Sequence, residues 1–141
     1  MEKIGVVSLW IGNCDSRMEL KNYVCLGYTA DGDQIYSKFA NEFDFGHTDE
    51  DSLEYEFYSE KLILIKDLLK SFSYSDLIIE RFKNLLGESK FNKSVNSIIL
   101  LHDYEHEDDI ILNNDIEYVG CISYLQDLLK GISRFIIIGG T

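Results

Sequence analysis

Hydrophobic residues near the N-terminus fill both alternating sets of positions between Ile4 and Ile11. Successive side chains of a strand point to opposite faces, so a half-buried strand alternates between apolar and polar residues. Because both sets are largely apolar here, the pattern predicts a strand that is buried on two faces. We expect Gly12-Asn13 to end this strand, and we expect Trp10, the only tryptophan, to pack in the core.

Two of the predicted helices carry boundary signals. Ser16 followed by Glu19 is a capping-box pattern, in which a hydroxyl and a carboxylate satisfy backbone N–H groups at the start of a helix. Ser73 or Ser75 is expected to cap the start of a later helix. Gly87 is expected to end it, because glycine commonly terminates helices.

Apolar spacing along the chain predicts the remaining elements. They are a turn at 31–33, helices over 16–26, 37–43, 60–72, 75–86 and 124–130, and strands over 53–57, 96–104, 116–124 and 134–138. An acidic loop joins the pair of strands over 96–104 and 116–124. This order of elements predicts an α+β fold, with one mixed β-sheet packed against two longer and one or two shorter helices.

A length of 141 residues fits a single domain, 1–141, that can bury a sizeable core without disulfides or metal. We expect one core, built from the apolar faces of the predicted strands and helices. Its predicted members include Val7, Leu9, Leu62, Ile65, Leu69, Phe82, Ile99 and Leu101.

The composition is typical of a cytoplasmic protein. No apolar run approaches the length of a membrane span, and the N-terminus lacks the organisation of a signal peptide. Cys14, Cys25 and Cys121 are an odd number of cysteines without a C-x-x-C spacing, which argues against a disulfide framework or a zinc site. We therefore expect a cytoplasmic location and no association with membranes.

Acidic residues are concentrated in two stretches of sequence that contain no Lys or Arg. Residues 39–60 and 94–129 hold eight acidic residues each, 16 of the 25 in the chain, whereas the remaining segments carry 13 basic and 9 acidic residues. Solubility requires charge but does not require this segregation, whereas docking onto a basic partner surface does. A net-acidic surface repels phosphate, so we expect no direct binding of nucleic acid.

The acidic stretches are the predicted partner-binding surface. The acidic residues predicted to contact the partner are Asp44, Asp49, Glu50, Asp51, Glu54, Asp103, Glu105, Glu107, Asp108 and Asp109. Aromatic residues, which commonly anchor protein interfaces, flank the first stretch. They are Phe43, Phe45, Tyr55, Phe57 and Tyr58.

Two histidine-containing segments resemble metal or catalytic sites but lack the required spacing or order. His102 and His106 follow a strand pattern, and strand residues four apart lie roughly 13 Å from each other, too far for one ion to bridge. His47 stands beside Asp49–Asp51, but this run has neither the order of a calcium loop nor a recognisable acid–base constellation. We expect no metal, no cofactor and no enzymatic activity.

The order of several motifs resembles a known family. Trp10 precedes Gly12-Asn13 at the predicted strand end, Phe43-Asp44-Phe45-Gly46 precedes the acidic run Asp49-Glu50-Asp51, and a hydrophobic strand begins at Asn96. With these motifs, from about residue 6 to residue 124, the chain resembles the predicted bacterial immunity proteins called immunity protein 22. The resemblance implies an α+β protein that is encoded beside a polymorphic toxin, often a nuclease, and neutralises it in the producing cell. It implies no particular contact residues.

Three functions stay open from the sequence alone. The first is an immunity protein that binds a cognate toxin, which is expected to present a basic surface. The second is a small acidic adaptor module with another protein partner, and the third is a carboxylate-based, metal-dependent enzyme. Carboxylates without a recognisable catalytic constellation favour the first function over the third. A toxin gene beside the coding sequence would favour the first over the second.

Overall fold

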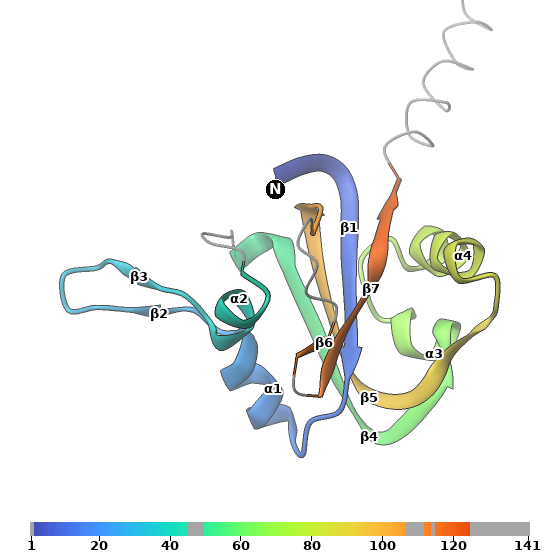
Figure 1. The fold of residues 1–141 in the computed structure, drawn as a ribbon, viewed down its shortest axis with the longest axis horizontal. Coiled ribbons are helices and arrows are strands. Elements are labelled where there is room, and N and C mark those ends of the chain that lie inside the picture. Colours follow the sequence, from blue (N-terminus) through green and yellow to red (C-terminus); the bar gives the residue numbers. More distant parts are fainter. Residues whose placement is uncertain (1, 45–49, 107–111, 114, 125–141) are drawn as a thin grey trace, which may run out of the picture.

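The computed structural model describes residues 2–44, 50–106, 112–113 and 115–124. Its centre is a five-stranded sheet with the order β4-β5-β1-β7-β6 (Figure 1). The strands are β1 (Glu2–Gly12), β4 (Leu53–Leu64), β5 (Lys90–Tyr104), β6 (Leu112–Asn113) and β7 (Ile116–Ser123). The α+β class is confirmed, and the described sheet is antiparallel throughout rather than mixed. Period-two spacing predicts a strand but contains no information about the direction of its neighbour.

β1 is the central strand of the sheet. Trp10 lies opposite Ile99 of β5 on one side and Tyr118 of β7 on the other. The side chains from Val6 to Ile11 are all buried, which confirms the predicted strand with two buried faces. Because β1 lies between β5 and β7, the two strands that the acidic loop connects do not pair with each other.

Two helices cover each face of the sheet (Figure 1). α1 (Arg17–Val24) and α2 (Lys38–Glu42) lie on one face, and α3 (Ile65–Leu69) and α4 (Ser75–Leu86) lie on the other. The short strands β2 (Gly27–Tyr28) and β3 (Gln34–Ile35) form a separate hairpin, and a 3-10 helix, η1 (Glu50–Ser52), precedes β4. Within the described residues there are two longer helices, α1 and α4, and two shorter ones, α2 and α3, which agrees with the predicted number. In the described segments, no helix is long and apolar enough to cross a membrane.

The predicted helix over 60–72 is wrong at both ends, because residues 60–64 belong to β4 and residues 70–72 lie outside α3. β4 continues to Leu64, which pairs with Lys90, and only Ile65–Leu69 is assigned as the helix α3. Leu62 contacts the same core as Ile65, Leu68 and Leu69, although it does so from a strand. Apolar spacing alone therefore does not distinguish the end of a buried strand from the start of a helix.

The predicted cap at Ser16 forms real hydrogen bonds. Ser16 Oγ accepts a hydrogen bond from the Glu19 N–H at 3.1 Å, and the Glu19 carboxylate accepts one from the Asp15 N–H at 2.6 Å. The carboxylate thus reaches one residue further back than in a standard capping box. The predicted serine cap of the later helix is wrong, because Tyr74 is the N-cap of α4 and makes no side-chain capping hydrogen bond. Gly87 ends α4 in the left-handed conformation, with φ of 71°.

Buried side chains form two cores, one on each face of the sheet, and the predicted single core is wrong. The core under α3 and α4 contains Val7, Leu9, Ile65, Leu69 and Phe82, with partly buried Leu62 against it. The core under α1 and α2 contains Ile99 and Leu101, together with Trp10, Phe39 and Phe43. Leu9 pairs with Leu100 of β5, and both side chains point to the α3/α4 face. Ile99 and Leu101, on either side of Leu100, therefore point to the α1/α2 face.

Candidate functional site

The two acidic stretches meet at one end of the sheet. β4 begins where β5 ends, with Leu53 opposite Leu101. β1 starts at the same end, where Glu2 pairs with Tyr104 (Figure 1). Antiparallel pairing therefore places the first acidic stretch beside the start of the second. We define the acidic rim as Asp44, Asp51, Glu54, Asp103 and Glu105.

The rim consists of the predicted partner-binding residues whose side chains the structure describes. Asp44, Asp51 and Asp103 are exposed, and Glu54 and Glu105 are partly buried. Asp44 is placed near Glu105 by contacts of the residues beside them in the sequence. The ring centroid of Phe43 lies 5.9 Å from that of His106. Glu50 is described only as the first residue of η1, and Asp49, Glu107, Asp108 and Asp109 lie outside the described residues.

Glu54 connects three parts of the fold. Its Oε1 atom lies 2.7 Å from Nε2 of His102 on the adjacent strand, and its Oε2 atom accepts a hydrogen bond from the Ser73 N–H at 3.2 Å. The Ser73 contact ties the segment between α3 and α4 to the start of β4. Both carboxylate oxygens therefore have contacts within the chain, so Glu54 fixes the rim in addition to supplying charge.

Asp103 and Glu105 tie the rim to β1. Asp103 has a positive φ of 59°, and its Oδ1 atom accepts a hydrogen bond from the Gly5 N–H at 2.9 Å. Aspartate is among the residue types that tolerate this left-handed conformation, because a short polar side chain can hydrogen-bond locally. Glu105 Oε2 lies 3.0 Å from Nζ of Lys3. These contacts fix the positions of two rim carboxylates relative to β1.

Folding brings basic side chains back to other parts of both acidic stretches. Arg17 Nη2 lies 2.6 Å from Oε1 of Glu56, and Lys93 Nζ lies 3.3 Å from Oε2 of Glu117. Both basic residues come from outside the acidic stretches. The segregation of charge along the sequence is therefore partly undone in three dimensions.

An aromatic cluster supports the rim on the α1/α2 face. The His106 ring is buried, with its centroid 4.6 Å from that of Tyr118 and 5.7 Å from that of Trp10. Burial raises the pKa of the Tyr118 hydroxyl to about 12. These contacts hold the residues that follow β5 against β1 and β7.

The two histidines of the candidate metal motif lie on opposite faces of the sheet. The ring centroid of His102 is 6.4 Å from that of Tyr124, which belongs to the α3/α4 core. His106 packs against Trp10 in the other core. Across the described part of the chain, no three His, Cys, Asp or Glu side chains form a group that could hold a metal ion.

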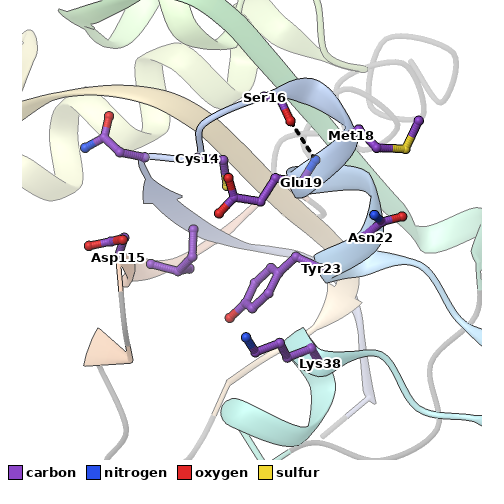
Figure 2. A pocket seen from close by; sticks show the side chains of 10 residues that line it. Cys14, Ser16, Met18, Glu19, Asn22, Tyr23, Lys38 and Asp115 are labelled. Atoms are coloured by element: carbon purple, nitrogen blue, oxygen red, sulfur yellow. Dashed lines mark hydrogen bonds between the residues drawn. The ribbon is translucent and has the colours of Figure 1, made fainter.

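A pocket of about 670 Å³ lies at the opposite end of β1 from the rim (Figure 2). Its lining includes Glu19 and Tyr23 of α1, Lys38 of α2, Asp115 beside β7, and Cys14 after β1. These side chains surround one open space, although they come from separate segments of the chain. Only the folded topology brings them together, so no local pattern in the sequence indicates this pocket.

The pocket holds groups that are protonated near neutral pH. Burial raises the pKa of the Cys14 thiol, a hydrogen bond with Ser97 partly opposes this, and nearby carboxylates raise it further. A neutral thiol is a weak nucleophile. Burial and the hydrogen bond that the Tyr23 hydroxyl donates to Glu42 Oε2 at 2.6 Å raise the pKa of Tyr23. Neither group has the lowered pKa of an activated nucleophile.

A comparison with known families identifies the chain's relatives. The family model described as Immunity protein 22 matches residues 7–125, which extend from β1 through β7. The chain belongs to the Immunity protein 22 family. No curated protein and no solved structure matches it. The resemblance inferred from the motifs of the sequence is therefore confirmed.

In this member of the Immunity protein 22 family, the motif residues Trp10 and Gly12 have structural roles. Trp10 is fully buried, and its ring centroid lies 4.8 Å from that of Phe39 in an edge-to-face arrangement. A Cβ atom at Gly12 would overlap the carbonyl oxygen of Asp115 and would lie 3.0 Å from Cα of Ile116. The glycine thus allows β7 to begin directly against β1. Neither residue belongs to the acidic rim.

Proposed function

We propose that this member of the Immunity protein 22 family binds a cognate protein toxin through the acidic rim and thereby neutralises it. The family match over residues 7–125 supports an immunity role and is the observation that carries the proposal. We further propose that the toxin belongs to a polymorphic toxin system and is a nuclease. Neutralisation is stoichiometric and non-enzymatic in this proposal.

Charge complementarity supports a toxin with a basic surface. The chain has a formal net charge of −12, and three carboxylates of the rim are exposed. A nuclease surface that holds phosphate is basic, so an acidic partner gains association rate and correct orientation from long-range attraction. The same negative charge disfavours direct binding of this chain to nucleic acid.

The internal contacts of the rim support its use as an interface. Asp103 is bonded to the backbone of β1, and Glu54 is bonded to His102 and to the Ser73 N–H. Side chains that are already ordered lose less conformational entropy when a partner binds. A rim held by these contacts is therefore preorganised for association.

Co-expression with the toxin encoded beside the chain tests the proposal. The wild-type chain is expected to restore growth. The rim variant, Asp49→Lys, Glu50→Lys, Asp51→Lys, reverses the charge of Asp51 of the rim and of the two acidic residues directly before it in the sequence, and it is expected to restore growth less well. Charge reversal at the rim should also slow association and weaken its dependence on salt concentration. Stopped-flow or surface plasmon resonance measurements at two salt concentrations supply the rates.

A matched control changes the net charge by the same amount at exposed positions away from the rim. Asp31→Lys, Asp33→Lys and Glu88→Lys combine two positions in the β2–β3 turn with one just after α4. This control variant is expected to protect cells better than the rim variant. Equal protection and equal association rates for the two variants would contradict binding through the rim. Failure of the wild-type chain to bind the toxin would contradict the immunity role itself.

A further inference from the structure

Tyr74 presents an exposed aromatic ring beside the acidic rim. The ring stacks on Tyr124, with centroids 5.3 Å apart and planes inclined by 23°. Tyr124 is 8% exposed and belongs to the α3/α4 core, whereas Tyr74 is 59% exposed. A buried ring therefore supports one side of Tyr74, while most of the Tyr74 side chain faces solvent.

The backbone at Tyr74 does not favour tyrosine. With φ of 57° and ψ of 32°, the residue is left-handed, and it occupies the N-cap of α4 without a capping hydrogen bond from its side chain. Glycine or asparagine adopts this conformation more readily, and asparagine or serine caps a helix better. In the described part of the chain, the Tyr74 ring is held by stacking on Tyr124, whereas its left-handed backbone does not favour a tyrosine.

Two carboxylates of the rim border the tyrosine pair. Glu54 accepts a hydrogen bond from the N–H of Ser73, the residue directly before Tyr74. Asp103 is connected to Tyr124 through Gly5, whose N–H donates to Asp103 Oδ1 at 2.9 Å and whose carbonyl oxygen accepts from the Tyr124 N–H at 2.9 Å. An exposed aromatic face and a fixed negative charge thus occur side by side.

We propose that the exposed face of Tyr74 receives an arginine side chain of the toxin, whose guanidinium group also pairs with Asp103. The inference rests on the proposed toxin-binding function and adds a specific anchor to the rim. A planar guanidinium ion stacks on an aromatic face and forms directed hydrogen bonds with a carboxylate, whereas the ammonium group of lysine lacks the planar face. Tyrosine and arginine are also enriched among the residues that dominate binding energy at interfaces.

The variant Tyr74→Gly separates a binding role from a folding role. Glycine suits the left-handed backbone, so the variant is expected to keep the melting temperature of the wild type despite the lost stacking. Binding to the purified toxin domain is expected to weaken roughly tenfold, mainly through faster dissociation. Tyr74→Phe keeps the ring and is expected to bind like the wild type. Surface plasmon resonance measures both rates.

Two further variants provide controls. Tyr28→Gly removes a ring that is 58% exposed in the β2–β3 hairpin, and it is expected to leave binding unchanged. Tyr74→Asn repeats the main test with a residue that suits both the left-handed conformation and the helix cap, in case Tyr74→Gly folds poorly.

A double-mutant cycle tests whether Tyr74 and Asp103 contact the same toxin side chain. Asp103→Asn removes the charge but keeps an oxygen for the Gly5 N–H and tolerates the positive φ. If one arginine contacts both residues, the effects of Tyr74→Gly and Asp103→Asn on binding are less than additive. Additive effects would contradict a shared arginine.

The outcomes distinguish the anchor from the proposed function. Weaker binding by Tyr74→Gly or Tyr74→Asn, at an unchanged melting temperature, supports the anchor. Wild-type affinity in both variants overturns the anchor and leaves toxin binding by the rim intact. Absence of toxin binding by the wild-type chain overturns the proposed function, and the anchor with it.

Discussion

Truncation of Ile99 to alanine should destabilise the protein by about 2–5 kcal/mol. Ile99 lies on the central part of β5 with no exposed surface, in the core under α1 and α2. The substitution removes three carbon atoms, and at about 0.8 kcal/mol for each buried CH₂ the transfer cost alone is about 2.4 kcal/mol. The cavity that remains adds to this cost, because Trp10 and Tyr55 on the neighbouring strands are hydrogen-bonded into the sheet and can move little.

Urea denaturation measures this loss. Fluorescence of Trp10, which lies opposite Ile99, reports on this core, and circular dichroism reports on the whole fold. A loss of about 3 kcal/mol should lower the melting temperature by roughly 6–12 °C in a domain of this size. Ile4→Ala is the matched control, because Ile4 lies on β1 with 78% of its surface exposed, and it should change stability by less than about 0.5 kcal/mol. A loss that small for Ile99→Ala would refute its place in the core.

Two other predictions concern the close approach of β1 to β7 and the partly buried Tyr118. Gly12→Ala should destabilise by about 1–3 kcal/mol or more in urea denaturation, because the new Cβ overlaps backbone atoms of Asp115. Gly27→Ala, where a Cβ would lie 3.5 Å from Cβ of Ile35, should cost less than Gly12→Ala. Stability should fall as the pH rises from about 10 towards 12, because the folded state keeps the Tyr118 proton with a pKa of about 12 while the unfolded state releases it near pH 10. Tyr118→Phe should lose less stability than the wild type between pH 9 and pH 11, and equal losses would contradict the raised pKa.

Local patterns in the sequence predicted the elements that depend on near neighbours. The two-faced burial of β1, the cap at Ser16 and the stop at Gly87 all depend on residues within a few positions of one another. The predicted short helix that buries Phe39 and Phe43 is confirmed for the same reason, with the Ser37 hydroxyl accepting from the Ala40 N–H. The predicted helix over 124–130 and the predicted strand over 134–138 lie outside the described residues, apart from Tyr124 itself.

Features that depend on distant partners were not predictable from local patterns. Ile99 and Val7 were assigned to one core because both are apolar, but the register of β1 and β5 sends them to opposite faces. The position of each acidic stretch was visible in the sequence, whereas their convergence depends on the pairing of β4 with β5. The ion pair between Arg17 and Glu56 also depends on tertiary structure, because the two residues are far apart in the sequence. That the acidic residues contact the partner stays a prediction.

The central position of β1 has a consequence for how the chain folds during synthesis. β1 is made first, but both of its neighbouring strands, β5 and β7, come from the last third of the described chain. At about 5–20 residues per second, the ribosome needs roughly 5–20 seconds to add the hundred or so residues that separate them. Throughout that delay the apolar strand Val6–Ile11 has no native partner, and such segments are prone to aggregate. The long sequence separation of these contacts also predicts slow folding for a domain of this size, so protective activity should appear only after β7 has left the ribosome.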